Sequence, residues 1–433
     1  MWLLAKEWRE LVAARAFWVL LAAMGPLVGF AFIGAVQTYA EASGFNGTAA
    51  GVGEAFSPLV GVWAPTFSAC ELAAVFLLPF VGIRLVAGDR QSGALKLELQ
   101  QPMSSAARIA TKALILMAGW IVASLAPLVA VVLWRIYGGA IYAPELASVA
   151  LGHLLNAALT IGLAAAMAGI SEHPSTAAIL TLSATVGTWI VNFVAAVNGG
   201  WWERAAAYTP TAMVAEFQHG LIRLDVLLVA ILLSAAALLF AAIWLRIGVR
   251  VRRRGLESAA LAALAALAIG AATHATRSWD VSEDRANSFP VADEAALGRI
   301  RGHLSVEAHL APEDPRRFDL DRRALRKLKR VLPDLTVTYI SATSIGLFEQ
   351  NSPHYGEVWY ALGGRRVMSR VTTAEGVLEA VYDVAQVAPP GDTGTLFRGH
   401  PLAVPPRGAA WVFYGIWPAV VAGVGLAVYR RRR

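Results

Sequence analysis

The chain has 433 residues, of which 57% are hydrophobic and 15% are charged, and its net charge is +7. Soluble proteins carry about 25% charged residues, so this composition excludes a single soluble domain and indicates that lipid surrounds much of the chain. The basic residues flank apolar runs, as in membrane proteins, which argues against a nucleic-acid partner. The single cysteine, Cys70, lies in an apolar segment, so we expect neither an intrachain disulfide nor a cysteine metal site.

The first predicted element is an amphipathic helix at the membrane surface, over residues 2–12. Its apolar residues are Trp2, Leu3, Trp8, Leu11 and Val12. Its charged residues are Lys6, Glu7, Arg9 and Glu10. Separation of the two kinds of side chain predicts that the helix lies in the plane of the bilayer surface.

Eight mostly apolar runs follow, each of the length, about 20 residues, that a helix needs to cross a bilayer. They lie near Phe17–Val36, Thr66–Val86, Ile109–Trp134, Leu146–Gly169, Thr176–Val197, Leu224–Leu245, Leu256–Thr276 and Gly408–Val428. The seventh run is rich in alanine and contains Glu257, so its hydropathy is marginal. The predicted fold class is an α-helical integral membrane protein of about eight spans.

The flanking charges predict the orientation of these spans, because basic residues are retained on the cytoplasmic side. With a cytoplasmic N-terminus, the inner segments hold Lys6, Arg9, Arg15, Arg84, Arg90, Lys96, Arg108, Lys112, Arg246, Arg250, Arg252, Arg253, Arg254 and Arg430–Arg433. The short outer loops hold only Arg135, Arg204 and Arg223. Both basic clusters that flank the last two runs belong inside, so the marginal seventh run must also cross.

This topology predicts four parts. They are a six-span domain with the surface helix (1–255), a seventh span (256–276), an extracytoplasmic domain (277–406), and an eighth span with a basic cytoplasmic tail (407–433). Both termini would then be cytoplasmic. In a Gram-negative cell, the protein would lie in the inner membrane and residues 277–406 in the periplasm.

Residues 77–114 form a basic, glycine-containing stretch between the second and third spans. This stretch resembles a pattern of ABC-2 type permeases, particularly those grouped with gliding-motility and nitrous-oxide-reductase-maturation permeases. The matching positions are Pro79, Arg84, Asp89, Gly93, Leu95, Leu97, Leu99, Pro102 and Ser104. The sequence departs from that pattern at Gly88, Ala94 and Lys96. Residues 6–10 with Phe17 resemble the entry helix of the same family, and residues 209–225 resemble its outer helical turn and re-entry.

The resemblance implies the membrane-spanning permease of an ABC exporter, not an enzyme. No Gly-x-x-x-x-Gly-Lys-Ser/Thr sequence occurs, so this chain would bind no cofactor, and ATP and Mg would lie on a separate ATPase, expected in two copies. The permease would form a homodimer or a heterodimer. The candidate ATPase-coupling residues are Glu7, Arg9, Arg84, Asp89, Arg90, Gly93, Leu95, Lys96 and Pro102. The alternative is that the stretch is only a basic cytoplasmic anchor.

Four polar residues lie within predicted spans, where ionised groups are costly and usually face protein or water. They are Glu71, His153, Asn156 and Asn192. The predicted topology places all four at the midplane or in the outer half of the bilayer. They could line a polar vestibule on a transport pathway, or they could form hydrogen bonds between helices of a packed bundle.

The extracytoplasmic segment has an ordinary charge density and mixed periodicity. Its predicted elements are strand 303–310, helix 321–332, strand 335–341, a hairpin of strands 357–362 and 365–371 around Gly363-Gly364, and a helix capped by Thr372-x-x-Glu375. This order resembles the thioredoxin fold, with Ser352-Pro353 before the third strand. Because the segment contains no cysteine, redox chemistry is excluded.

Residues 279–285, with Ser288, are similar to the start of the auxiliary domain of gliding-motility-type ABC transporters. The chain therefore looks like a permease fused to a shortened auxiliary domain. A second function stays open, in which the spans carry ATPase motion to an outer domain that acts on a periplasmic protein and nothing crosses the membrane.

Two surfaces of the outer domain stand out. The helix over 321–332 carries Arg322, Arg323, Arg326, Lys327, Lys329 and Arg330, which would be solvated or would contact lipid headgroups or an acidic protein. His303, Ser305, Glu307 and His309 alternate on one face of a strand. His303 and His309 are about 20 Å apart at 3.3 Å per residue, so this face is predicted to be a solvated edge and not a metal site. No catalytic residues emerge.

Overall fold

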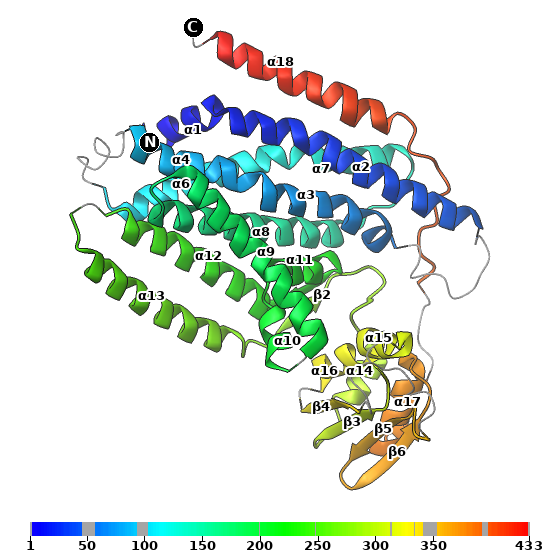
Figure 1. Cartoon of the computed structure of the whole chain (residues 1–433). Coiled ribbons are helices and arrows are strands. Elements are labelled where there is room, and N and C mark those ends of the chain that lie inside the picture. The colour runs from blue at the N-terminus through cyan, green and yellow to red at the C-terminus, as the bar shows by residue number, and fades with distance from the viewer. Residues whose placement is uncertain are drawn as a thin grey trace. The chain divides into compact units, whose positions relative to one another are not determined.

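The structure is a computed structural model that describes residues 2–45, 57–92, 103–198, 200–246, 248–311, 314–332, 334–340, 353–391 and 397–431 (Figure 1). It divides into two compact units. The first comprises Met1–Val281 and Arg398–Arg433, and the second comprises Ser282–Phe397. The second unit is therefore an insertion between the last two long helices of the first.

The first unit is almost entirely helical. Its helices are α1 (Trp2–Ala13), α2 (Arg15–Phe45), η2 (Leu59–Trp63), α3 (Ala64–Phe76), α4 (Leu78–Ser92), α6 (Ser105–Ala123), α7 (Leu125–Ile136), α8 (Ala143–Ile170), α9 (Pro174–Asn198), α10 (Trp201–Ala206), α11 (Pro210–Gln218), α12 (Leu224–Trp244), α13 (Val251–Ala272), η5 (Trp411–Ile416) and α18 (Trp417–Arg430). Two short strands, β1 (Leu221–Arg223) and β2 (Ser278–Asp280), complete it.

Eight helical stretches of the described residues are long and apolar enough to cross a membrane, which confirms the predicted number of spans. They are Arg15–Gly44, Leu59–Arg84, Ser105–Ile136, Ala143–Ile170, Pro174–Ala195, Leu224–Trp244, Val251–Ala272 and Trp411–Arg430. Several are assembled from consecutive helices, such as η2, α3 and α4 in the second. All begin or end within a few turns of the apolar runs, because the runs set the length of each helix.

Helix α8 lies at the centre of the first unit and packs against α3, α4, α6, α9, α11 and α12. Small residues permit the closest of these contacts. A Cβ atom on Gly162 would lie 3.0 Å from the carbonyl oxygen of Ser234 on α12, and one on Gly169 would lie 3.3 Å from the Cα of Ala241. Close backbone approach through small residues is the usual means of helix association in lipid.

Helix α2 packs against the last span through a second pair of glycines, Gly25 and Gly29. A Cβ on Gly25 would lie 2.2 Å from the Trp417 ring, and one on Gly29 would lie 2.4 Å from the Cβ of Phe413. The Trp417 indole nitrogen also donates a hydrogen bond to the carbonyl oxygen of Leu21, at 2.7 Å. The spacing of four residues is the small-x-x-x-small pattern of membrane helix pairs.

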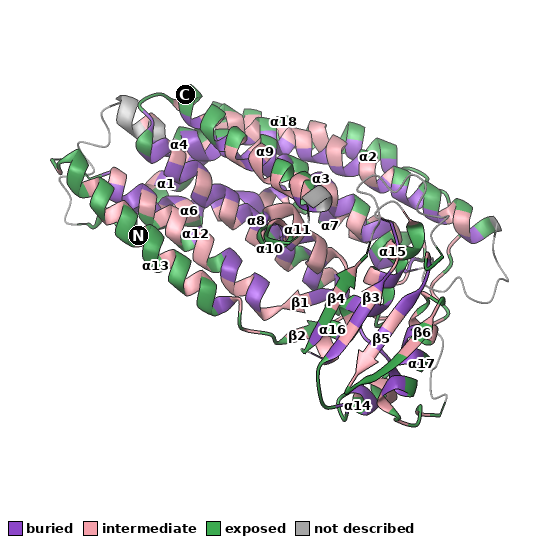
Figure 2. Cartoon of the chain, turned by 60° about the horizontal axis from the view of Figure 1, so that its bottom comes forward, coloured by how far each residue is buried: buried purple, intermediate pink, exposed green. Residues whose placement is uncertain are grey.

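The outermost helices expose most of their apolar side chains. Only 6% of the apolar window of Val251–Ala272 and 11% of that of Trp411–Arg430 is buried, against 61% for Ala143–Ile170. In Figure 2, α13 and α18 are mostly green and pink, for exposed and intermediate residues, whereas the central helices carry more purple, for buried ones. Exposed apolar faces of this size require lipid or another membrane protein as their neighbour.

The second unit contains a four-stranded sheet with the order β4-β3-β5-β6. Its strands are β3 (Leu304–Ala308), β4 (Leu335–Tyr339), β5 (Val358–Leu362) and β6 (Arg365–Ser369). β3 is parallel to β4 and antiparallel to β5, and β5 is antiparallel to β6. The helices are α14 (Val291–Leu297), α15 (Pro315–Leu320), η3 (Asp321–Leu325), α16 (Arg326–Val331) and α17 (Ala374–Ala385).

The predicted order of strands and helices in this unit is confirmed. The predicted apolar face of β3 is buried, with Leu304, Val306 and Ala308 at most 1% exposed. Gly363 and Gly364 both have positive φ, 56° and 85°, as a two-residue hairpin turn requires. Sequence alternation at period two therefore placed the core of this sheet correctly.

Three details of the prediction are wrong. The helix predicted over 321–332 starts earlier, because the Asp314 carboxylate caps α15 by accepting from the Arg316 amide, and a π-helical turn at Asp321–Leu325 interrupts it. The cap of α17 is Thr373, whose hydroxyl accepts from the Gly376 amide, and not Thr372. β3 is not an edge strand, since β4 and β5 flank it.

Candidate functional site

Helix α1 is amphipathic, but its buried face differs from the predicted one. The buried residues are Leu3, Glu7 and Leu11, which are four residues apart, whereas Trp2 and Trp8 are 60% and 39% exposed. One helical turn advances 3.6 residues, so positions 3, 7 and 11 share a face. The prediction that Trp2 and Trp8 share the apolar face with Leu3 and Leu11, opposite Glu7, is therefore wrong.

Glu7 is buried because it pairs with a lysine of another helix. Its Oε1 lies 2.8 Å from the Nζ of Lys112 on α6, and the two side chains are 0% and 4% exposed. Lys6 lies 3.3 Å from the same oxygen and 3.1 Å from Glu10. Arg108, one turn before Lys112, is also buried. A buried ion pair holds its partners in place, because removing one leaves an uncompensated charge.

The remaining predicted coupling residues are less completely described. Arg9 is exposed on α1 and Arg84 is exposed on α4. Asp89 and Arg90 lie in α4, which ends at Ser92, but their side chains lie outside the described part of the structure. Gly93, Leu95, Lys96 and Pro102 also lie outside the described residues. Beyond this gap, the Ser104 hydroxyl caps α6 by accepting from the Ala107 amide at 3.2 Å.

Two of the four predicted pathway residues line one pocket. Glu71 of α3 and Asn192 of α9 border a cavity of about 380 Å³, together with Ser68, Leu72, Trp189 and Thr211. Thr211 is at the start of α11 and is the hydrogen-bonding partner of the Glu71 carboxylate. Asn192 Oδ1 accepts a hydrogen bond from the Thr209 hydroxyl at 2.8 Å. Three helices therefore bring these side chains together.

His153 and Asn156 lie on α8 and are each 4% exposed. The Gln218 amide nitrogen lies 3.2 Å from His153 Nε2 and 3.4 Å from the hydroxyl of Ser68, a residue of the pocket wall. Neither amide atom of Asn156 has a hydrogen-bond partner within the described ranges. Hydrogen bonds between elements thus engage Asn192 and the Nε2 atom of His153. Within the described ranges they engage neither His153 Nδ1 nor the amide of Asn156.

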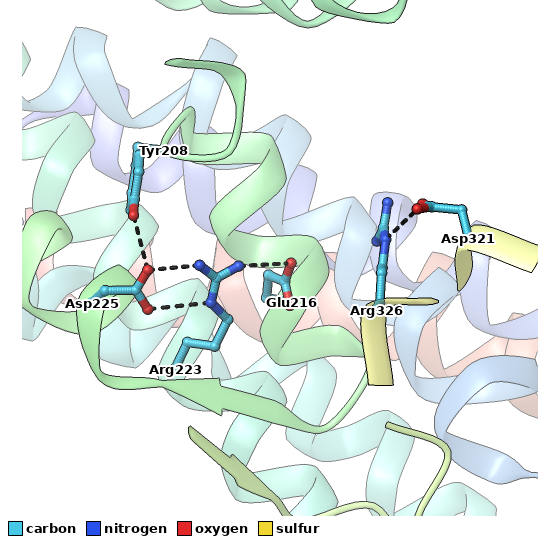
Figure 3. A network of polar contacts seen from close by, with 6 residues as sticks. All are labelled: Tyr208, Glu216, Arg223, Asp225, Asp321 and Arg326. Atoms are coloured by element: carbon cyan, nitrogen blue, oxygen red, sulfur yellow. Dashed lines mark hydrogen bonds and ion pairs between the residues drawn. The ribbon is translucent and has the colours of Figure 1, made fainter. Parts of the chain in front are cut away.

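A second polar cluster lies at the end of the bundle where β1 begins (Figure 3). Tyr208 donates a hydrogen bond to Asp225 Oδ2 at 2.9 Å, and the Arg223 guanidinium binds both oxygens of Asp225, at 2.6 and 3.2 Å. The same guanidinium lies 3.5 Å from Glu216 of α11. Burial and the Asp225 carboxylate raise the pKa of Tyr208 to about 12. In the sequence, Arg223 is recognisable only as an outer-loop charge, so this cluster was not predicted.

Strand β1 follows α11 and pairs with β2, a residue range that the sequence analysis did not predict to be a strand. Leu221 pairs with Asp280, and Ile222 with Trp279. The Val281 amide donates to the carbonyl oxygen of Gly220 at 2.8 Å, and Leu224 donates to Arg277 at 2.9 Å. The chain is therefore hydrogen-bonded to the helical unit up to the residue before Ser282, where the second unit begins.

The basic residues of the second unit divide into two groups. Arg322, Arg323, Arg326 and Lys329 are exposed, although Arg323 lies 3.7 Å from Asp319 and Arg326 lies 3.0 Å from Asp321 (Figure 3). Lys327 and Arg330 are half-buried. Lys327 lies over the Phe289 ring, and Arg330 binds Asn287 and Ser288. Two of the six predicted partner-surface residues thus hold their own unit together.

The polar face of β3 is occupied by contacts within the sheet. Glu307 pairs with Arg366, and His303 Nδ1 lies 2.9 Å from Asp334. The ring centroid of His309 lies 6.1 Å from that of His354. Among the residues that the structure describes, no group of three or more His, Cys, Asp or Glu side chains could hold a metal ion.

The fold defines a multi-pass helical membrane protein with one mixed α/β unit inserted near its end. Comparison with known families agrees with the first part of that description: residues 1–200 match the model of the ABC-2 family transporter protein. No curated protein and no solved structure matches the chain. The predicted similarity to ABC-2 permeases is thereby confirmed over these residues, and it supports a membrane permease subunit of an ABC transporter that works with an ATPase partner.

Proposed function

We propose that this chain is the permease of an ABC exporter and that a separate ATPase subunit drives it. The buried Glu7–Lys112 pair is the observation that carries the proposal. It joins the surface helix α1 to α6, the helix that follows the segment resembling the ATPase-contacting pattern of ABC-2 permeases. A movement of either element would be passed to the other, because a buried ion pair resists separation.

The mechanism follows from this connection. Closure of two ATPase subunits around ATP would push on residues 89–104 and on α1, which contribute Arg9, Asp89, Arg90 and Lys96. Helices α4 and α6 are continuous with spans two and three, so the push would reorient the outer halves of those spans. The pocket beside Glu71 and Asn192 would then open or close toward the outer face.

The wider arrangement belongs to the same proposal. The charge distribution favours cytoplasmic termini, an inner-membrane location, and an extracytoplasmic position for the second unit. Two permease chains, identical or different, would form one pathway with two ATPase copies. The exposed apolar faces of α9, α13 and α18 are available to a second chain or to lipid.

For the second unit we propose a thioredoxin-like fold and an origin as a fused gliding-motility-type auxiliary domain. The sheet has its second strand at one edge, next to the first, followed by the third and fourth. The first pair is parallel and the others are antiparallel. This order supports the resemblance. A membrane-facing or protein-binding role would use the exposed Arg322, Arg323, Arg326 and Lys329.

Copurification tests the ATPase partnership. The tagged chain is expressed with a candidate ABC ATPase from the same organism, and the amount of ATPase recovered per permease is measured. The double reversal Arg90→Glu with Lys96→Glu should lower that amount, whereas Arg135→Glu with Arg204→Glu, in predicted outer loops, should not. Equal recovery for both double variants would contradict the assignment of residues 89–104 to coupling.

A second candidate function is mechanotransmission to a periplasmic protein without transport. Pairing of β2 with β1 favours it, because motion of α11 or α12 would pass directly into the chain that enters the second unit. A flexible Gly-Ser insertion after Val281 should abolish complementation of a deletion strain if this function holds, with the ATPase rate unchanged. Full complementation by the insertion variant would leave export as the function.

A further inference from the structure

Glu71 is an acidic residue within a membrane span, and its carboxylate has no basic partner among the residues that the structure describes. It lies in Leu59–Arg84, the second span, and its hydrogen-bonding partner is the uncharged Thr211. Within the described ranges, no lysine, arginine or histidine forms an ion pair with it. A carboxylate at such a depth costs about 2.5–3.5 kcal/mol on insertion scales, so a counter-charge from outside the chain would be favourable.

The cavity beside Glu71 combines a negative charge with aromatic and aliphatic surface. Trp189 and Leu72 form part of its wall and are 37% and 46% exposed. The Trp189 ring is held edge-on against Phe76, with ring centroids 6.1 Å apart and planes at 72°. An indole face is the best aromatic partner for a cation. The volume of about 380 Å³ falls within the usual range for small-molecule sites, roughly 300–1,000 Å³.

Among the described residues that line the cavity, Glu71 is the one with an ionisable side chain. Asn192 Oδ1 accepts from Thr209, and the Ser68 hydroxyl donates to the carbonyl oxygen of Ala64 at 2.8 Å. Gln218 connects Ser68 to His153, so the polar surface continues from the cavity toward α8. Asn156, one turn further along α8, is buried with both amide atoms unpaired among the described residues. The cavity is therefore continuous, through Ser68 and Gln218, with the polar side chains of α8.

We propose that this cavity binds a monovalent organic cation with an apolar body. Glu71 supplies the counter-charge, Trp189 contacts the cation through its ring, and Leu72 contacts the apolar part. The site rests on the proposed permease function, for which it names the class of cargo. The same ammonium chemistry occurs in free amines and in choline or ethanolamine headgroups of lipids.

Equilibrium binding of tetraphenylphosphonium tests the proposal. The full chain is placed in nanodiscs and radiolabelled probe is counted, with subtraction of empty discs of the same lipid. Tetraphenylborate has nearly the same shape and the opposite charge, so it controls for partition into lipid. The expected result is saturable binding of the cation at about one site per chain and no saturable binding of the anion.

Two substitutions locate the site. Glu71→Gln should weaken cation binding at least about tenfold, and Trp189→Leu about threefold to tenfold, since desolvated charge and cation–π contacts have these magnitudes. Glu41→Gln makes the same chemical change at an exposed position of α2 and should leave binding unchanged. Because Glu71→Gln could disturb folding, each variant is first compared with the wild type by size-exclusion profile and melting temperature.

Equal affinity of the wild type and Glu71→Gln would overturn the proposal, as would saturable binding of the anion. Loss of binding in Glu41→Gln would also overturn it. Absence of binding to any form, as expected if a second chain covers the cavity, would overturn it as well. Discs of phosphatidylcholine and of phosphatidylglycerol separate the two ligand sources, because a choline headgroup that occupies the site would compete with the probe. The binding measurement needs no ATPase. A negative result would therefore contradict the cation site alone, whereas the copurification experiment tests the ATPase partnership.

Discussion

Glu7 Oε1 and Lys112 Nζ lie 2.8 Å apart between two helices that are about a hundred residues apart in the sequence, and both side chains are almost completely buried. This pair makes α1 part of the helical bundle and not merely a surface anchor. It also places a charged contact on α6, the helix that follows residues 93–102 in the chain.

Removal of one partner of this pair should be costly. Glu7→Gln takes away the negative charge that faces Lys112, and the expected loss of stability is about 3–5 kcal/mol. The double variant Glu7→Gln with Lys112→Met should lose less than the sum of the single variants. Thermal unfolding in nanodiscs measures both, and Glu10→Gln, whose pair with Lys6 is partly exposed, should cost at most about 1 kcal/mol. Additive effects would show that the two residues act separately.

A larger side chain at Gly29 should force the first span away from the last. Gly29→Val places a Cβ 2.4 Å from that of Phe413, which neither backbone can accommodate without a shift. Overpacking of this kind costs about 1–3 kcal/mol, visible as a lower melting temperature. Gly34→Val is the matched control on the same helix, because a Cβ at Gly34 meets nothing within 4 Å. Equal melting temperatures of the two variants would contradict the contact between α2 and η5.

Asp314 should make the second unit sensitive to acid. Its hydrogen bond with Arg316, supported by Tyr355, lowers its pKa from 3.8 to about 2. A depressed carboxyl pKa contributes stability that is present above about pH 4 and is lost as the pH falls toward 2. Asp314→Asn should destabilise this unit near neutral pH and remove that part of the acid sensitivity. Hydrogen exchange of α15 against pH measures the effect; identical pH profiles for the two forms would contradict it.

Cysteine labelling tests the proposed orientation. In a Cys70→Ala background, Lys329→Cys should react with a membrane-impermeant maleimide in intact cells with a permeabilised outer membrane. Arg253→Cys, which lies between spans six and seven, should react only after the inner membrane is opened. Labelling of residue 329 only after that opening would place the second unit in the cytosol and would contradict the export model.

The spans and the core of the second unit could be predicted because each depends on local periodicity. Twenty apolar residues need a bilayer, and alternation at Leu304, Val306 and Ala308 needs one buried sheet face. Contacts between distant segments could not be predicted in the same way. Nothing local to Leu221–Arg223 or Ser278–Asp280 identifies their pairing, because three-residue strands carry too few side chains to show a pattern.

Some signals were present but ambiguous. Leu3, Glu7 and Leu11 share a helix face by spacing, yet an acid is normally assigned to water, and only a partner such as Lys112 reverses that assignment. Gly25 and Gly29 show the small-x-x-x-small spacing without indicating which helix they meet. The position of Glu71 and Asn192 within spans was predictable. Their common cavity was not, because it also needs Thr211 of α11, which lines it beside them.

The inserted unit is tied to the helical unit on both sides of the insertion. On the entry side, the amide of Leu224, the first residue of α12, donates to the carbonyl oxygen of Arg277 at 2.9 Å. On the return side, the carbonyl oxygen of His400 accepts from Tyr39 at 2.8 Å and the Leu402 amide donates to Ser43 at 2.9 Å, both on α2. Any change in the distance between α2 and α12 therefore changes the distance between the two chain segments that flank the inserted unit. The inserted unit would be pulled or released at both of its ends.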